Sequence, residues 1–204
     1  MKEALEHYAK TTLDTFVTQQ FYKPLGLSTM TYLPRQHVYA NRLIPTEYDK
    51  EFRKQLVHGY VHDPGAAMLG SVGGHAGLFA NANDVAVIMQ MLLNNGEYGG
   101  VRYFKEETVT KFTSAYVAGN RRGLGFDKPE PDQSKPGPTA RSASPATFGH
   151  TGFTGTCAWA DPATGLVYVF LSNRINPSAD NKKLLEQNVR TDIQQVVYDA
   201  MKKQ

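Results

Sequence analysis

The stretch TFGHTGFTGTCAWADPATGLVYVFL, residues 147–171, decides the fold that this sequence predicts. Short apolar or alternating runs are separated by glycine-containing turns, which is the pattern of consecutive antiparallel strands. We expect strands at 147–153, 154–160 and 166–171, with a tight connection at 161–165. The last strand is apolar on both alternating faces, so it is expected to be covered on both sides.

Segments with a helical period lie on both sides of this stretch. The clearest is 82–94, in which apolar residues recur at the i, i+3, i+4, i+7 spacing of a helix with one buried stripe. Asn81 precedes it and Asp84 follows three residues later, as in a capping box. The other predicted helices are 1–17, 105–114 and a closing helix at 181–202.

Between these elements the sequence predicts a short strand at 123–126 and two long loops, 28–56 and the proline-rich, solvated 128–146. Helices and loops therefore dominate residues 1–120, and antiparallel strands plus a closing helix make up residues 121–204. The predicted fold class is α/β (α+β), an antiparallel sheet flanked by helices within a single domain.

Composition bounds the class of protein. The 204 residues are 41% hydrophobic and 20% charged, which is typical of a globular chain. The net charge of +3 is too small, and the Lys and Arg residues too dispersed, to indicate a nucleic-acid partner. No stretch has transmembrane length, and the first residues lack the apolar core of a signal peptide. The lone Cys157 lies in an apolar run and is expected to be buried.

The segment His150–Phe153 carries the most informative chemistry. Gly152 lacks a Cβ, so a ligand has room to lie against the backbone there. Thr151 is able to hydrogen-bond an anionic group, His150 to add a donor, and the backbone N–H of Phe153 to face a developing oxyanion. The alternative is an ordinary strand with a surface histidine.

His150-Thr151-Gly152 resembles the Lys-Thr-Gly element of serine β-lactamases and penicillin-binding proteins, with His in place of Lys. Further segments resemble this family in its own order and span nearly the whole chain. These are FYKPLGL at 21–27, GHAGLFA at 74–80, GLGF at 123–126 and SNR at 172–174.

The resemblance implies a β-lactamase/transpeptidase-like fold, closest to the class C and D-Ala-D-Ala carboxypeptidase-like branches, and a hydrolase that forms an acyl-enzyme without a cofactor or metal. His150, Thr151 and Gly152 would bind the substrate, and the Phe153 N–H would supply half of an oxyanion hole. The substrate would be a D-Ala-D-Ala peptide of peptidoglycan, a β-lactam or a small ester. The complete bacterial protein would work in the periplasm or cell envelope.

Two catalytic motifs of the family have no match in this chain. No serine is followed three residues later by lysine, so the Ser-x-x-Lys nucleophile is absent. Tyr39-Ala40-Asn41 fits Tyr-x-Asn but follows the Pro24–Gly26 turn, whereas the family motif precedes the matching helix. We therefore expect a C-terminal portion of the domain, inactive alone, with its nucleophile and base encoded elsewhere. A non-catalytic binding or structural module of the same fold is the alternative.

An incomplete sheet has a physical consequence. The family's sheet also takes strands from the N-terminal part of the domain, so the strand at 166–171 would present an open edge. We expect this edge to pair with another copy or with a separate N-terminal fragment, or else the chain to be marginally stable alone.

A second group of polar residues has no assigned role. His58, His62, Asp63 and His75 include residue types that bind zinc, but the surrounding segment is rich in Gly and Pro and has no complete His-Glu-x-x-His pattern. The segment 61–66 also resembles a recurrent element of the carboxypeptidase-like branch of that family, and this resemblance implies a structural hydrogen-bonding role, or a place in the cleft wall, for the segment.

Overall fold

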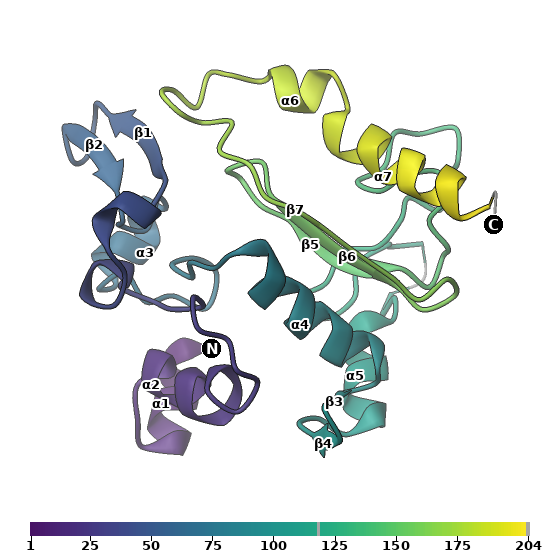
Figure 1. Ribbon diagram of the computed structural model, residues 1–204, viewed down its shortest axis with the longest axis horizontal. Coiled ribbons are helices and arrows are strands. Elements are labelled where there is room, and N and C mark those ends of the chain that lie inside the picture. Colours follow the sequence, from purple (N-terminus) through teal and green to yellow (C-terminus); the bar gives the residue numbers. More distant parts are fainter. Residues whose placement is uncertain (118, 203–204) are drawn as a thin grey trace. The chain divides into compact units, whose positions relative to one another are not determined.

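A computed structural model describes residues 1–117 and 119–202 (Figure 1). Contacts divide the chain into two compact units. The first unit consists of Met1–Asp84 and Asn173–Asn181, and the second begins at Val85, runs to Ser172 and resumes at Lys182. Each unit is described by itself.

The second unit is built on a three-stranded antiparallel sheet. Its strands are β5 (Phe148–Thr151), β6 (Cys157–Asp161) and β7 (Leu166–Phe170), in the order β5-β6-β7. The three predicted strands of the 147–171 stretch are thus confirmed, with β6 beginning later than expected. Cys157 is buried as predicted, and burial raises the pKa of its thiol to about 11.

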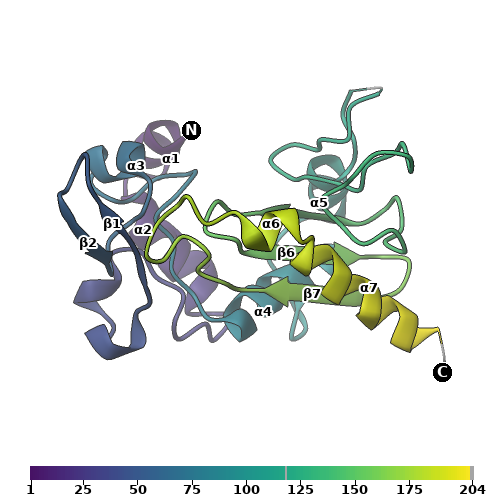
Figure 2. The same cartoon turned by 90° about the horizontal axis from the view of Figure 1, so that it is seen from above.

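Helices cover both faces of this sheet (Figures 1 and 2). On one face, Met89 of α4 (Ala82–Leu93) packs against Phe148 and Ala160. On the other, Tyr198 of α7 (Val189–Met201) packs with Leu166. Alternate residues along the strands therefore face two different apolar layers. This arrangement confirms the predicted antiparallel sheet flanked by helices.

The helix predicted at 82–94 is confirmed as α4, and that at 105–114 as α5 (Glu106–Thr113). Asn81 caps α4, because its side-chain oxygen accepts the Asp84 N–H at 2.8 Å. A small hairpin, β3 (Glu97–Tyr98) and β4 (Val101–Arg102), lies between these helices and was not predicted.

Two predicted helices are interrupted by residues in the left-handed conformation. The segment 1–17 divides into α1 (Lys2–Ala9) and α2 (Leu13–Val17), with Lys10 between them at φ 55°, and a π-helical turn, Thr18–Tyr22, follows. The closing segment divides into α6 (Lys183–Glu186) and α7 at Asn188, where φ is 52°. A residue at positive φ cannot continue a right-handed helix, so both predictions of one long helix were wrong.

The strand predicted at 123–126 was also wrong. The N–H of Gly123 donates to the carbonyl of Phe126 at 3.0 Å, and Gly125 has φ 85°. These residues therefore form a tight turn. The extended pairing occurs one residue later, where Asp127 and Gly149 form an isolated antiparallel bridge.

In the first unit, part of the loop predicted at 28–56 is a hairpin. Strands β1 (Pro45–Asp49) and β2 (Gln55–His58) pair antiparallel, after short 3-10 turns at Pro34–Gln36 and Ala40–Arg42. The Asp49 carboxylate accepts the N–H groups of Glu51, Phe52 and Arg53, which closes the turn. The short helix α3 (Pro64–Met68) follows.

The loop 128–146 is solvated only in part. Residues 131–136 are exposed, whereas Ala140 and Ala143 pack against Tyr198 in the second unit. Within the described ranges, none of the helices combines the length and apolarity needed to cross a membrane.

Candidate active-site strand

Strand β5 places His150 and Thr151 at its end, beside a tight turn. His150 pairs with Ala158 and Thr151 with Cys157 across the β5–β6 ladder. The N–H of Gly152 then donates to the carbonyl of Thr156 at 2.8 Å, which closes the turn. Successive residues of a strand point to opposite faces, so the His150 and Thr151 side chains leave the sheet on different sides.

Neighbouring atoms leave little space for a side chain at two glycines near His150. A Cβ at Gly149 would lie 2.0 Å from the Ala158 carbonyl oxygen and 2.6 Å from the Trp159 ring. A Cβ at Gly152 would lie 2.3 Å from the Thr156 hydroxyl oxygen. The close contact with Thr156 thus gives a packing reason for glycine at position 152. That a ligand has room to lie against the backbone there stays a prediction.

The two ring nitrogens of His150 have different partners. Its Nδ1 lies 2.6 Å from the Thr151 carbonyl oxygen, which only accepts, so Nδ1 carries the proton. Its Nε2 lies 2.9 Å from Nη1 of Arg122, which only donates, so Nε2 accepts. Both contacts are satisfied together by the tautomer that carries its proton on Nδ1.

Arg122 belongs to a charged cluster beside β5. Arg121 donates from Nε to buried Asp127 at 2.7 Å and from Nη1 to Glu130 at 3.2 Å. The hydrogen bond to Asp127 is the main cause of the raised pKa of Arg121. Nη2 of Arg122 approaches Asp127 at the longer distance of 3.4 Å. Of these two arginines, Arg121 is therefore the closer ion-pair partner of Asp127.

Lys128 ties this cluster to the base of β5. Its ammonium donates to the carbonyl oxygens of Thr113, Ala146 and Thr147 at 3.1–3.2 Å. Burial lowers the pKa of Lys128, because desolvation disfavours the charged form. The segment 121–130 therefore brings three cations and two carboxylates next to the strand that carries His150.

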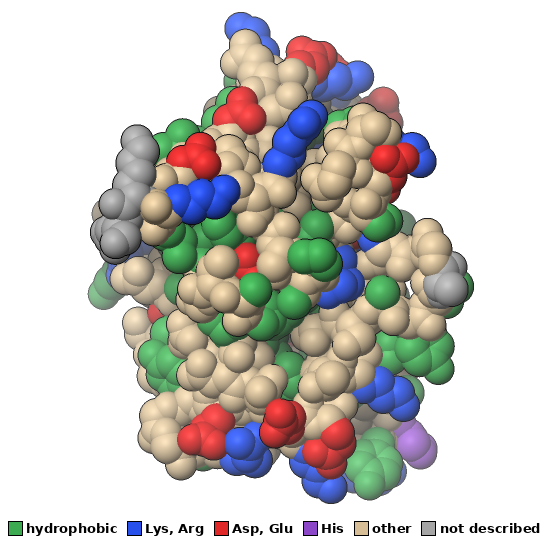
Figure 3. All heavy atoms as spheres, turned by 90° about the vertical axis from the view of Figure 1, so that its right-hand side faces the viewer, with side chains coloured by type: hydrophobic (Ala, Val, Ile, Leu, Met, Phe, Trp, Pro, Cys, Tyr) green, Lys and Arg blue, Asp and Glu red, His purple; other side chains and the backbone are tan. Residues whose placement is uncertain are grey.

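Opposite charges are interspersed elsewhere on the surface as well. On the face drawn in Figure 3, basic and acidic side chains lie in small neighbouring groups among apolar and neutral ones. That face carries no extended field of a single sign.

The structure places the predicted site residues consecutively, with Phe153 63% exposed on the turn after β5. Sequence reasoning missed Arg122. It precedes His150 by 28 positions, and no motif links them. Tyr39, the tyrosine of the unmatched Tyr-x-Asn pattern, is 84% exposed and begins a 3-10 turn.

The His and Asp residues of the first unit form separate pairs. Nε2 of His58 lies 2.8 Å from the Leu43 carbonyl oxygen, which gives it a structural donor role. His62 faces Glu47 at 3.5 Å, and His75 faces Asp63 at 3.1 Å. Across residues 1–117 and 119–202, no three His, Cys, Asp or Glu side chains converge as a metal site would require.

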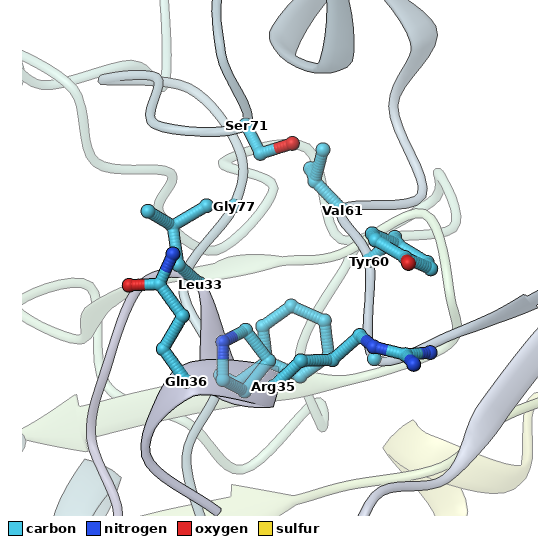
Figure 4. Close-up of a pocket in the computed structure, with 10 residues that line it drawn as sticks. Leu33, Arg35, Gln36, Tyr60, Val61, Ser71 and Gly77 are labelled. Carbon is cyan, nitrogen blue, oxygen red and sulfur yellow. The ribbon is translucent and has the colours of Figure 1, made fainter.

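The first unit also contains a small, mainly apolar pocket of about 90 Å³ (Figure 4). At the edge of the pocket, the Arg35 guanidinium lies 4.7 Å from the centre of the Tyr60 ring. The Ser71 hydroxyl points toward Val61. The pocket is too small for more than a few non-hydrogen atoms.

Comparison with known proteins identifies the family of this chain. The model of the β-lactamase family matches residues 1–191. The chain belongs to the β-lactamase family. An Escherichia coli (strain K12) protein named "Putative D-alanyl-D-alanine carboxypeptidase" is 37% identical over 184 residues, which cover 84% of this chain and 42% of that protein. The chain thus spans less than half the length of this curated relative.

Solved structures agree on the fold. A penicillin-binding protein homologue from Caulobacter crescentus aligns with a TM-score of 0.58 at 22% identity, covering 84% of this chain and 49% of that one. Simvastatin synthase from Aspergillus terreus aligns with a TM-score of 0.65 at 14% identity, covering 100% and 53%. At these identities the likeness concerns the fold, which is that of β-lactamase-type serine hydrolases and confirms the predicted fold class.

Proposed function

We propose that this chain forms the β5 side of the active site of a serine hydrolase that acts on an amide or ester through an acyl-enzyme. The observation that carries the proposal is His150-Thr151-Gly152 at the end of β5, next to a tight turn, in a chain of the β-lactamase family. Thr151 would hold the polar end of the substrate, with His150 beside it. The Phe153 N–H would donate to the oxyanion.

The nucleophile and base would come from sequence outside these 204 residues, since the chain has no Ser-x-x-Lys motif. The proposed substrates are a D-Ala-D-Ala peptide of peptidoglycan, a β-lactam or a small ester, and the proposed compartment is the periplasm or cell envelope. The name of the Escherichia coli relative supports the D-Ala-D-Ala peptide among these substrates.

A fluorescent penicillin tests the proposal. We expect the complete gene product to become covalently labelled and the 204-residue chain to remain unlabelled, because acylation requires the nucleophile. Labelling of the short chain would show that a serine within it reacts, and would contradict the assignment. A complete gene product that neither reacts with penicillin nor hydrolyses D-Ala-D-Ala peptides or small esters would favour the non-catalytic binding or structural module.

We also propose that the outer edge of β7 takes part in association with a second copy or a separate fragment. β7 is the last strand of the β5-β6-β7 order, and Leu171, directly after it, is 41% exposed. Light scattering on the 204-residue chain should show a mass that rises with concentration, and Leu171→Lys should reduce the rise, because an edge lysine opposes strand pairing. A mass that stays monomeric at all concentrations would exclude self-association.

A further inference from the structure

The β1–β2 hairpin of the first unit (Figure 1) buries one face and leaves the other in solvent. Tyr48 of β1 and Leu56 of β2 are cross-strand partners, so their side chains leave the hairpin on the same face. They are 52% and 45% exposed, whereas Val57, which points to the opposite face, is 1% exposed. Phe52 in the connecting turn is 51% exposed. Tyr48, Phe52 and Leu56 together are called the apolar tip.

Hydrogen bonds hold the backbone of the apolar tip in place. The hydroxyl of Tyr48 donates to the carbonyl of Lys54 at 3.1 Å, across the turn. The Asp49 carboxylate accepts the backbone N–H groups of residues 51–53. A surface that is already ordered loses less conformational entropy when it binds a partner. The fold itself therefore presents these apolar side chains to solvent.

Positive charge is in excess around the apolar tip. The carboxylates of Glu47 and Asp49 are engaged, because both accept backbone N–H groups. In the segment 42–58, all of which the structure describes, Glu51 is then the one acidic residue whose side chain is exposed. Three basic residues of the same segment are exposed, namely Arg42, Lys50 and Lys54.

We propose that the apolar tip docks the protein on an anionic phospholipid surface. Tyr48, Phe52 and Leu56 enter the headgroup region, where aromatic and aliphatic side chains bind favourably. Lys50 and Lys54 keep their ammonium groups among the lipid phosphates while their stems lie along apolar surface. This inference goes beyond the proposed hydrolase activity and does not depend on it.

A lipid surface fits the apolar tip better than a protein partner does. A stable protein interface buries about 800 Å² on each partner, and three apolar side chains at one turn are few for that area. A membrane surface requires no complementary shape. Its affinity grows with the apolar area that is buried and with the attraction between cations and anionic headgroups. The apolar tip and its excess of cations supply both contributions.

Vesicle flotation of the 204-residue chain tests the proposal. The vesicles are pure phosphatidylcholine, or phosphatidylcholine mixed with an equal part of phosphatidylglycerol. Phe52→Ser/Leu56→Ser removes apolar area, and its matched control is Tyr8→Ser/Met68→Ser, at two exposed apolar residues elsewhere in the first unit. Lys50→Glu/Lys54→Glu reverses charge. Its control, Lys10→Glu/Lys23→Glu, changes the net charge equally at exposed lysines of the same unit. Circular dichroism verifies that each variant folds.

We expect the wild type to bind the anionic vesicles about tenfold or more tightly than the neutral ones. Lys50→Glu/Lys54→Glu should weaken binding to anionic vesicles by about tenfold or more, because each cation near such a surface contributes roughly fivefold. Phe52→Ser/Leu56→Ser should weaken binding by about tenfold, since less apolar area is buried. Both controls should stay within about twofold of the wild type. Salt should weaken binding, because it screens exposed charges.

A tryptophan at position 52 reports which surface meets the lipid. Trp159 is the one tryptophan of the sequence and is 1% exposed, so a change in emission from Phe52→Trp reports on position 52. We expect its emission to shift to the blue when anionic vesicles are added, and brominated phospholipids to quench it. Emission that stays unchanged while the protein floats with the vesicles would show docking through another surface and overturn the proposal.

Three further results would overturn the proposal. One is that the folded wild type floats with neither kind of vesicle, or equally with both. Another is that the control variants lose as much binding as the tip variants. The third is a mass that rises with concentration without lipid and that Phe52→Ser/Leu56→Ser returns to the monomer, because the tip would then be an interface between two copies. Vesicle binding requires no nucleophile, so none of these results bears on penicillin labelling.

Discussion

The two units of this chain differ in the regularity of their backbone. In the second unit, a sheet lies between apolar layers that include Met89 and Phe148 on one face and Trp159 and Tyr168 on the other. In the first unit, carboxylates hold the loops by accepting backbone N–H groups. Asp49, Asp63, Asp84 and Glu47 all do so. Both units bury apolar side chains, including Leu27 and Val57 in the first unit. Where the backbone of the first unit is irregular, hydrogen bonds to carboxylates add to the stabilisation by burial.

The largest effect is expected in the apolar layer of the second unit. Trp159 is 1% exposed, so Trp159→Ala should lower the free energy of unfolding by about 3–5 kcal/mol. Urea denaturation measures the change, and hydrogen exchange should show the greatest loss of protection in β5, β6 and β7. Tyr116→Ala, at a side chain that is 65% exposed, is the control and should change stability by about 0.5 kcal/mol or less. Equal losses in the two variants would contradict the layered core.

A smaller effect is expected from the carboxylate that anchors the start of α4. Asp84 accepts both the N–H and the hydroxyl of Thr29 at 2.7 Å, so Asp84→Ala should cost about 2 kcal/mol. Thermal unfolding measures it, and hydrogen exchange should show faster exchange of the Thr29 amide. Asp84→Asn keeps one acceptor oxygen and should lose less. If Asp84→Ala is neutral, polar anchoring of the first unit is weaker than its geometry indicates.

The turn after β5 tests packing beside the candidate site. Gly152→Ala should cost about 1–2 kcal/mol, because the new methyl group would overlap the Thr156 hydroxyl. Thr156→Ala removes that oxygen and should restore most of the loss in the double variant, which a double-mutant cycle in urea detects. A loss that persists in the double variant would point to another cause, such as restricted backbone freedom.

The smallest effect is expected at the cap of α3. Asp63 accepts the Ala66 N–H at 2.7 Å, and this hydrogen bond is the main cause of its lowered pKa. Its side chain is 42% exposed, so Asp63→Ala should cost only about 0.5–1 kcal/mol at neutral pH.

The pH dependence of that effect follows from the direction of the shift. A carboxyl whose folded pKa lies below its unfolded value stabilises the fold above the unfolded pKa, and the contribution disappears as the pH falls through the folded pKa. The difference between wild type and Asp63→Ala should therefore shrink below about pH 4, measured by urea denaturation across pH. A constant difference down to about pH 2 would contradict the role of the ionised carboxylate.

The elements that the sequence predicts well are those whose pattern is local. The apolar stripe of 82–94 and the turn-punctuated run of 147–171 correspond to α4 and to β5, β6 and β7. The β1–β2 hairpin was missed because contacts distant in sequence hold it. The N–H of Tyr48 donates to the carbonyl of Pro177, and Glu47 accepts the N–H of Ala179. The β3–β4 hairpin did have a local signal, since Gly99 and Gly100 both have positive φ between its strands.

The residues of the candidate site likewise include some that a local sequence pattern reveals and one that it does not. His150, Thr151 and Gly152 were found because they are adjacent in sequence and match a motif. Arg122 was not, because only the chain's path from the Gly123–Phe126 turn to the Asp127–Gly149 bridge brings it to His150. The two hydrogen-bond partners of the His150 ring are likewise specified by no sequence pattern.

The anchoring by Lys128 has a practical consequence for engineering. Its ammonium fixes the carbonyls of Ala146 and Thr147, so the start and the end of the 128–146 loop are held together whatever lies between them. The exposed run 131–136 is then a natural place to splice in a peptide tag or a fluorophore attachment site, because lengthening a loop whose ends are already joined adds little entropic cost. A reporter grafted there would sit on the strand-bearing unit without replacing any residue of β5.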